Sequence, residues 1–350
     1  MKSIAVIISP NWQDYAKKYL ADFLSGLENQ DYPGVTKIFI TDNESSESSY
    51  DFLHLAMPAA EIHRNQGNDG YAKGCNDSIK RALAQGFDYI AIFNIHTVLE
   101  SDCLTQLIKT AESDPQIGAV QGRMMLWPEK DKISSLGNQT HFLGFGYCDQ
   151  YQQKYNHQDK QLKDIFYPSG SCFFVKAEVL NKIGLFEEEY WMYNEDQELG
   201  WRIWLAGYRC VLAPEAVLYN KYEFQRSIKK FYWMDRNRIL AILKSYRWPT
   251  LFLILPPFII METGLILFSL KTGWFKEKIR TWKYFLKLKN WRYIFQARKQ
   301  NQELRVLKDK DLKHLISGKI WYQEVDDWKL RLVNPFFNTY WRLARLVIFW

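Results

Sequence analysis

The first 126 residues alternate short apolar runs with segments whose apolar residues recur at helical spacing. The apolar runs cover 4–9, 37–43, 87–94 and 117–126. The helical segments cover 14–29, 71–86 and about 102–113. Strands that alternate with helices in this way predict an α/β fold, in which a mainly parallel sheet is sandwiched by helices. The uninterrupted apolar strands agree with this prediction, because a parallel sheet is buried on both faces.

Polar side chains follow the predicted strands at the points where the strands end. In open α/β sheets, ligands bind in the crevice at the carboxyl ends of the strands. We therefore expect one crevice to collect the side chains of Asn11, Asp42, Asn43, Asn94 and His96.

The charge is divided unevenly along the chain. Residues 1–225 carry 20 Lys and Arg against 30 Asp and Glu, whereas residues 226–350 carry 26 against 9. This asymmetry predicts two regions with different partners: an α/β domain at 1–225 and a basic, aromatic-rich helical region at 226–350. A basic region binds the phosphates either of nucleic acid or of lipid headgroups.

The cysteines and the amino terminus indicate a cytoplasmic protein. The five cysteines are scattered and form no CxxC motif. This pattern fits a reducing cytoplasm better than a disulfide framework or a zinc site. The first apolar run is too short for a signal peptide, so we expect it to be a buried strand and the chain not to be exported.

The first motif that carries chemistry is Thr41-Asp42-Asn43. A carboxylate just past a strand can accept hydrogen bonds from a uracil or thymine ring N–H, or from ribose hydroxyls. Taken alone, the pattern is more typical of a turn, because Asp and Asn commonly begin turns.

The second motif is the glycine-rich segment NQGNDGYAKGCN at 65–76. Glycines let the backbone approach a ligand, and the amino terminus of the following helix favours phosphate. Lys73 would add a positive charge there. The alternative is a plain glycine-rich loop with helix capping, which this segment alone fits equally well.

The third motif is YNEDQELGWR at 193–202, where Glu195 and Asp196 lie at a predicted helix start. One carboxylate would be a general base that takes the proton of an acceptor hydroxyl as that oxygen attacks a sugar. The alternative is structural, because acidic residues at a helix start are stabilised by the helix dipole.

Together these motifs resemble the family 2 glycosyltransferases of the GT-A fold, and especially their rhamnosyltransferase-like branch. The resemblance runs from Ile4 to about Arg238. It consists of IISPNW, TDNESS, NDGYAKGCN, YIAIFNIHT, PSGSCFFVKAEVLNKIGLFEE, YNEDQELGWR, AGYRCVLAPEAVLYN and RNR, in this order.

The resemblance implies roles in an inverting transfer from a nucleotide-diphosphate sugar. The base and ribose of the nucleotide would be surrounded by Pro10, Asn11 and Asp42. The rest of the nucleotide-sugar pocket would be lined by Asn43, Asn68, Gly70, Lys73, Asn76 and Asn94. The catalytic base would be Asp196, with Glu195 beside it and Arg202 bracing the motif. The acceptor is expected to contact Trp191, Tyr193 and Trp201.

One departure from the family's pattern concerns the metal. The family usually has an Asp motif after the glycine-rich loop, which binds a divalent cation (Mn or Mg) between the two phosphates. Here that site reads Asn94-Ile95-His96, and Asn220 stands where the family has a His. Magnesium prefers oxygen ligands, whereas imidazole tolerates manganese. Three alternatives follow: an altered metal site at His96, metal-free transfer with Lys or Arg balancing the diphosphate, or a degenerate enzyme.

The segment Leu251–Leu270 is long enough to span a bilayer at about 1.5 Å per residue. It contains Pro256-Pro257 and Glu262, however, and Lys and Arg flank both of its ends. This pattern favours an in-plane helix or a re-entrant hairpin over a span. We expect the basic region to hold the protein on an anionic membrane surface at the cytoplasmic face, with a further amphipathic anchor at 340–350. No recognised nucleic-acid module accompanies the charge, so no nucleic-acid partner is expected.

Three functions compete on these observations. The first is an inverting glycosyltransferase that acts on a hydroxyl of a lipid-linked or cell-surface glycan acceptor. The second is a catalytically weak homologue that serves as a scaffold in a membrane glycan-assembly complex. The substitutions at His96 and Asn220 favour the scaffold, and the intact motif at 194–202 favours the enzyme. A nucleotidyltransferase comes third, because it would need metal-binding carboxylates.

Overall fold

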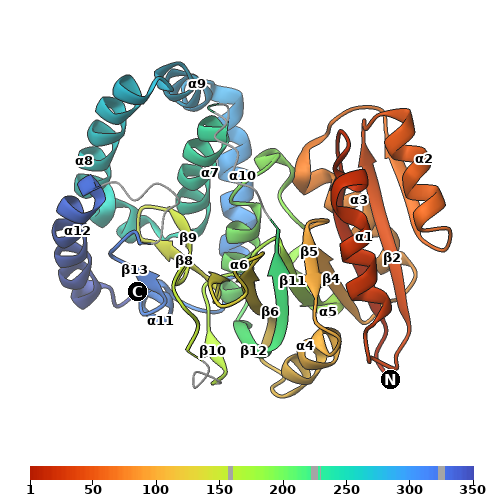
Figure 1. Cartoon of the computed structure of the whole chain (residues 1–350). Coiled ribbons are helices and arrows are strands. Elements are labelled where there is room, and N and C mark those ends of the chain that lie inside the picture. The colour runs from red at the N-terminus through yellow and green to blue at the C-terminus, as the bar shows by residue number, and fades with distance from the viewer. Residues whose placement is uncertain (157–160, 222–227, 229, 322–327) are drawn as a thin grey trace.

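The computed structural model describes residues 1–156, 161–221, 228, 230–321 and 328–350. A ten-stranded sheet forms its centre, in the order β10-β12-β6-β11-β4-β1-β2-β3, with β5 paired to β12 and β7 to β6 (Figure 1). The strands of this sheet are β1 (Ile4–Asn11), β2 (Thr36–Asn43), β3 (Glu61–Asn65), β4 (Tyr89–Phe93), β5 (Thr97–Leu99), β6 (Ile117–Leu126), β7 (Ile133–Ser135), β10 (Lys163–Asp164), β11 (Cys172–Lys176) and β12 (Arg209–Asn220).

The sheet is mainly parallel, which confirms the predicted fold class. Strand β1 pairs in parallel with β2 and β4, β2 pairs in parallel with β3, and β6 pairs in parallel with β12. The exception in the middle of the sheet is β11, which runs antiparallel to both β4 and β6. The parallel strands therefore end at one edge, where the polar residues that follow them gather.

Helices cover both faces of the sheet because consecutive strand residues point to opposite faces and are apolar on both. Ile4, Val6 and Ile8 of β1 pack against α1 (Tyr15–Glu28), α2 (Glu47–Ala56) and α4 (Cys103–Glu112). Ala5 and Ile7 point to the opposite face. That face is covered by α3 (Gly70–Ala84), α5 (Ala177–Ile183) and α6 (Glu195–Leu205).

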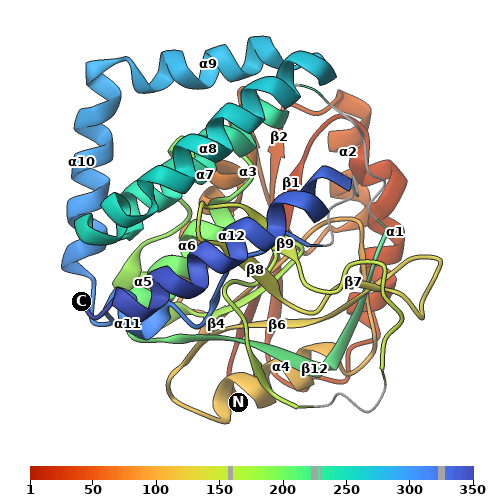
Figure 2. The same ribbon diagram turned by 90° about the vertical axis from the view of Figure 1, so that its left-hand side faces the viewer.

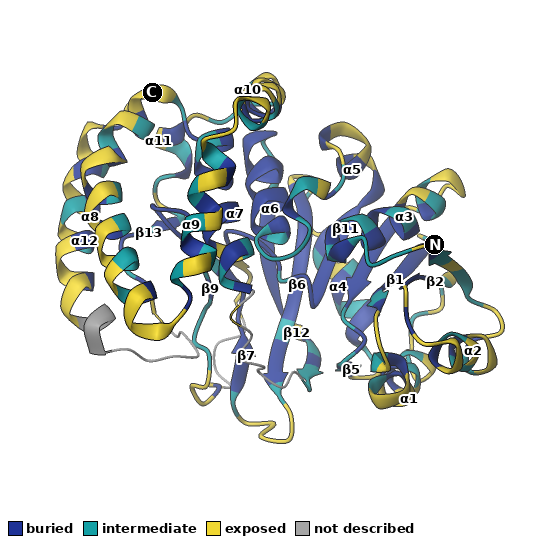
Figure 3. Cartoon of the chain, turned by 90° about the horizontal axis from the view of Figure 1, so that it is seen from above, coloured by how far each residue is buried: buried dark blue, intermediate teal, exposed yellow. Residues whose placement is uncertain are grey.

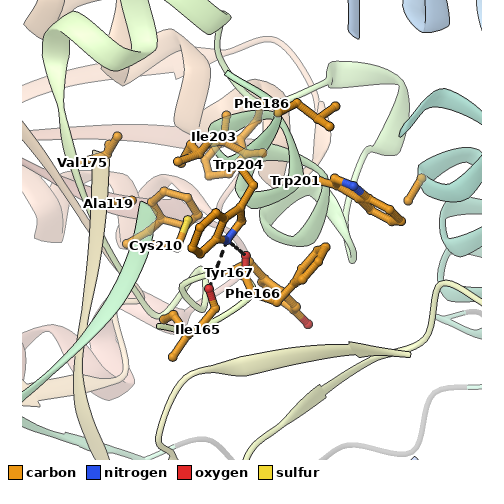
Figure 4. Close-up of a cluster of buried hydrophobic side chains, with 14 of the residues drawn as sticks. Ala119, Ile165, Phe166, Tyr167, Val175, Phe186, Trp201, Ile203, Trp204 and Cys210 are labelled. Carbon is orange, nitrogen blue, oxygen red and sulfur yellow. Dashed lines mark hydrogen bonds between the residues drawn. The ribbon is translucent and has the colours of Figure 1, made fainter. Parts of the chain in front are cut away.

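The segment 127–166 contains short strands. Strands β8 (Asn138–His141) and β9 (Gly146–Cys148) form a small sheet with β13 (Ile316–Ser317). The end of this segment closes over α6, where the Trp204 indole donates hydrogen bonds to the carbonyls of Ile165 and Phe166 (Figure 4). These contacts fix α6 beneath the segment.

The carboxyl-terminal third is helical. Its helices are α7 (Lys230–Ser245), α8 (Trp248–Thr272), α9 (Phe275–Phe285), α10 (Leu288–Glu303), α11 (Asp309–Leu312) and α12 (Trp328–Val347). Apolar side chains of α7, α8 and α12 belong to the same buried cluster as those of α3 and α6. The division at residue 225 stays a prediction, and the two regions share this core.

Helix α8 corrects one expectation. The segment 251–270 is a single continuous helix and not a re-entrant hairpin, although Pro256 and Pro257 lie inside it. It is the one helix among the described residues that is long and apolar enough to cross a membrane. The helix persists through the proline pair, so the two prolines do not create the turn that a hairpin requires.

Candidate active site

The ends of β1 and β2 bring Asn11 and Asp42 into contact. The Asn11 side-chain amide donates to the Asp42 carboxylate at 2.8 Å, and the side-chain oxygen of Asn11 accepts from the backbone N–H of Ala16 at 3.1 Å. The other Asp42 oxygen lies 3.3 Å from Nε of Arg64. The side chains of Asn11 and Asp42 are fully buried at the ends of these strands. Their contact with a nucleotide stays a prediction.

The glycine-rich loop lies directly over these strand ends. A Cβ on Gly74 would lie 2.3 Å from Cγ of Pro10, so only glycine permits this approach. The Asn43 amide donates to the carbonyl of Gly70 at 2.9 Å, and the Asn68 side-chain oxygen accepts from the Gly70 N–H at 3.1 Å. The structure thus brings Pro10, Asn43, Asn68 and Gly70 together, as the sequence predicts.

Two other residues assigned to the pocket have protein partners. The ammonium of Lys73 lies 3.1 Å from Asp69 and 2.8 Å from Asp77. The Asn76 side chain is buried and exchanges hydrogen bonds with the backbone of Phe186, at 2.8 and 3.1 Å. Asn76 therefore anchors the segment that leads into the acidic motif, and Lys73 is held by neighbouring acids on its own helix.

The acidic motif begins α6 beside the glycine-rich loop. The Asp196 carboxylate accepts hydrogen bonds from the N–H groups of Gly170, at 3.0 Å, and Gln197, at 2.8 Å. The carbonyl of Gly170 in turn accepts from the Tyr71 hydroxyl of α3 at 2.8 Å. Burial raises the pKa of Asp196 to about 6. This carboxylate is therefore held in place and is basic enough to accept a proton near neutral pH.

Glu195 differs from its neighbour. Its side chain is buried, and burial together with the nearby Asp196 charge raises its pKa well above the usual value. Two adjacent carboxylates in a low-dielectric site do not both ionise easily. Of the two side chains, Asp196 is the more exposed.

Arg202 braces the motif from within the protein. Its guanidinium contacts the Glu198 carboxylate and donates to the carbonyls of Ile183 and Leu185. Burial alone would raise the pKa of the Glu198 carboxyl. The neighbouring cations of Arg202 and Lys244 outweigh this effect and lower the pKa of Glu198 to about 2. Arg202 is therefore a positioning residue.

The three aromatic residues predicted to contact the acceptor have different surroundings in the structure. Trp191 is half-buried beside Gly70 and stacks on Trp233 of α7, with ring centroids 4.8 Å apart, and Tyr193 is half-buried next to it. Trp201 is 1% exposed and packs edge-on against Phe166 and Tyr246. The expectation that Trp201 contacts the acceptor is wrong, because its side chain is enclosed in the core.

The side chains at the expected metal position contact other residues of the protein. The Asn94 amide donates to the Ser171 hydroxyl at 2.7 Å, and the His96 ring packs edge-on against Tyr19. Burial lowers the pKa of His96 to about 4. Within the described ranges, no three His, Cys, Asp or Glu residues lie close enough to hold a metal ion. The family's usual donor set is therefore not reproduced at Asn94-Ile95-His96.

Asn237 of α7 is a site residue that the sequence reasoning missed. Its amide lies within hydrogen-bond distance of three carbonyls, those of Tyr190 (2.9 Å), Met192 (3.0 Å) and Tyr193 (2.7 Å). These carbonyls belong to the segment in which Trp191, Tyr193 and Asn194 have φ of 60 to 65°. Left-handed backbone is unfavourable for the two aromatic residues, so this segment needs external support. The one signal in the sequence was RNR at 236–238.

Replacing Asn237 with Ala is expected to lower the unfolding free energy by about 1–3 kcal/mol, because buried carbonyls lose their donor. The left-handed turn would relax and carry Asp196 away from Gly170, so turnover should fall as well. Thermal melting and steady-state kinetics measure the two effects. Met234→Ala, at an exposed position of the same helix, is the matched control. An Asn237→Ala protein with unchanged melting and turnover would contradict this assignment.

Comparison with known proteins identifies the family. Residues 2–238 match the model of the family described as glycosyltransferase like family 2. An N-acetylglucosaminyl-diphospho-decaprenol L-rhamnosyltransferase of Mycobacterium tuberculosis is 23% identical over 237 residues, which cover 62% of this chain and 75% of the relative. A poly-beta-1,6-N-acetyl-D-glucosamine synthase of Staphylococcus aureus is 27% identical over 154 residues, covering 43% of this chain and 34% of that protein.

Solved structures share the fold. Crystal structures of S. aureus TarS 1-349, with UDP or with UDP-GlcNAc, cover 99% of this chain and 88% of theirs at 16% identity, with TM-scores of 0.52 and 0.53. GalNAc-T7 with UDP, GalNAc and Mn2+ covers 70% of this chain and 48% of its own, at 12% identity and a TM-score of 0.53. These likenesses identify the GT-A fold. Since the family model matches more than half of the chain, this protein belongs to the family 2 glycosyltransferases.

Proposed function

We propose that this glycosyltransferase catalyses an inverting sugar transfer with Asp196 as general base. Asp196 takes the proton of an acceptor hydroxyl, and the acceptor oxygen forms a bond to the anomeric carbon of the sugar. The bond from that carbon to the diphosphate breaks, and the nucleoside diphosphate leaves with the electron pair. A single displacement of this kind inverts the configuration at the anomeric carbon.

The observation that carries the proposal is the short connection between Asp196 and the glycine-rich loop. Gly170 accepts from Tyr71 and donates to Asp196, so α3 and α6 are joined through one residue. The backbone of Ala72 also donates to the carbonyl of Trp191 at 3.1 Å. A donor held on the loop would thus lie beside the base, as a direct displacement requires.

The acceptor proposed is a lipid-linked or cell-surface glycan. Two relatives in this comparison are named for a diphospho-decaprenol acceptor and for a polysaccharide product. The chain also carries one apolar helix of membrane-spanning length among its described residues. A charged nucleotide-sugar does not cross a bilayer readily, so the cytoplasmic face is the side proposed for the reaction.

Nucleotide binding tests the site before the acceptor is known. Calorimetry with UDP, GDP, dTDP and CDP is expected to reveal one preferred nucleoside diphosphate. Failure of all four to bind would overturn the proposal. Repeating the titration and the transfer assay with a chelator and with added Mn2+ separates a metal-dependent reaction from a metal-free one.

Gly70→Ala is expected to weaken nucleotide binding by about tenfold or more, which corresponds to at least 1.4 kcal/mol. Gly70 has φ of +85°, and a Cβ there would lie 2.5 Å from Cδ1 of Trp191. The added methyl would push Trp191 and the loop apart. Gly67→Ala is the matched control in the same loop, because a Cβ there meets nothing within 4 Å. Equal affinities of the two variants would show that the loop does not hold the nucleotide.

A further inference from the structure

Helix α8 has two faces of different surroundings, although nearly all of its residues are apolar. Ile254, Pro257 and Met261 are buried against the body of the protein. The opposite side leaves large apolar side chains in the open, with exposed fractions of 69% for Phe252 and 65% for Leu267. The exposed apolar residues of α8 are Trp248, Phe252, Leu255, Ile259, Ile260, Leu267 and Leu270.

Helix α12 repeats this arrangement beside α8 (Figure 2). Its inner side packs through Phe337, Trp341 and Ala344, and Trp341 stacks on Phe142 with centroids 5.0 Å apart. The Tyr340 hydroxyl donates to the carbonyl of Leu253 at 2.6 Å, which joins the two helices. The outer side of α12 exposes Leu332, Val333, Phe336, Leu343, Leu346 and Val347.

We infer that these two outer sides form one lipid-docking surface, which binds an anionic bilayer with α8 and α12 lying in the membrane plane. The exposed apolar residues named above define the α8–α12 surface. Both helices lie at the outer side of the molecule and carry exposed segments (Figure 3). Large exposed apolar patches mark membrane or protein interaction sites. This inference rests on the membrane location proposed above and specifies the elements and orientation that produce it.

Glu262 argues for the in-plane orientation over a span. Its carboxylate pairs with Arg238 of α7 and, at 2.6 Å, with Lys278 of α9. Asp235 pairs with the same two cations at 2.7 and 2.9 Å. Moving α8 into a bilayer as a span would break this cluster and place a carboxylate near the middle of the hydrocarbon. The cluster therefore holds α8 against α7 and leaves only its outer side for lipid.

The charge next to the α8–α12 surface favours an anionic lipid partner. Exposed cations continue from the end of α8 along α9 and are Lys271, Lys276, Arg280, Lys283 and Lys287. Arg342 is exposed on α12. Amphipathic helices in a membrane interface combine apolar burial with basic residues that contact anionic headgroups. A second copy of this chain would bring like charges together at the same surface.

Vesicle flotation tests the docking surface without any sugar donor. The full chain is expected to float with vesicles of phosphatidylglycerol and phosphatidylcholine, and to remain bound in high salt. The double variant Leu343→Glu/Leu346→Glu, and separately Phe252→Glu, should weaken binding by about tenfold or more, since charge replaces buried apolar area. The matched control is Leu286→Glu/Leu288→Glu, because these leucines are 80% and 82% exposed but lie outside the α8–α12 surface.

Two further measurements separate the alternatives. Cysteines introduced at Pro249 and Thr272, near the two ends of α8, should both react with a membrane-impermeant maleimide added from the side of protein addition. Labelling at only one end would show a span and overturn the in-plane inference.

A concentration-dependent dimer that the Leu343→Glu/Leu346→Glu variant abolishes, without vesicle binding, would assign the surface to a second copy. Transfer to a water-soluble acceptor that persists while vesicle binding is absent would refute docking and leave the proposed function intact.

Discussion

Replacing Asp196 with Asn is expected to slow sugar transfer by about 10²–10⁴-fold while nucleotide binding is retained. The amide has nearly the same shape as the carboxylate and can keep an oxygen toward the N–H of Gly170, so the fold of the motif should survive. An amide cannot take the proton of the acceptor hydroxyl, however. The loss should therefore appear in kcat, measured with saturating donor, and leave the calorimetric affinity for the nucleoside diphosphate unchanged.

The pH profile gives a second readout of the same base. Burial raises the pKa of Asp196 to about 6, and the ionised form is the one that accepts a proton. Activity should thus rise through pH 6 and fall about tenfold per pH unit well below it. Glu178→Gln, an exposed position on α5, is the matched control and should keep the wild-type rate and profile. If Asp196→Asn retained near-normal turnover, Asp196 would not be the base.

The main sheet could be predicted because its strands are buried on both faces. Strands β1, β2, β4 and β6 stand out as apolar runs, and the helices between them show their spacing directly. The antiparallel direction of β11 could not be predicted, because a buried strand carries the same pattern in either direction. The pairing of β8 with β13 could not be predicted either. Thr140 pairs with Ile316, which lies far along the chain, and the local spacing of apolar residues does not indicate such a pairing.

Some residues of the site could likewise be predicted from the sequence, and others could not. Asp196, Gly70 and Pro10 lie in short motifs whose order along the chain indicated their neighbourhood. Asn237 acts on a backbone segment more than forty residues away, so only the folded structure reveals it. The prediction for Trp201 was wrong because of its position around α6. Trp201 follows Asp196 by five residues, and at about 100° per residue it lies roughly 140° around the helix from Asp196, on the side that faces the core.

Glu262 interrupts the apolar run at 251–270, and the sequence alone could not name its partner. The structure places it in the four-charge cluster with Arg238, Asp235 and Lys278, all of them at least largely buried. Replacing Lys278 with Met is expected to lower the unfolding free energy by about 3–5 kcal/mol. Asp235 and Glu262 would then share the single cation of Arg238, so one buried negative charge would be left uncompensated. Urea unfolding followed by tryptophan fluorescence measures the loss.

The double variant Lys278→Met/Glu262→Met distinguishes charge imbalance from a packing defect. It removes one charge of each sign and leaves the pair between Asp235 and Arg238, which lies at 2.7 Å. We expect the double variant to be more stable than the sum of the single losses predicts, by about 2–3 kcal/mol. Lys283→Met removes an exposed cation of the same helix and should change stability by no more than about 0.5 kcal/mol. Strictly additive losses would mean that the cluster contributes through packing, and that charge pairing does not hold α8 against α7.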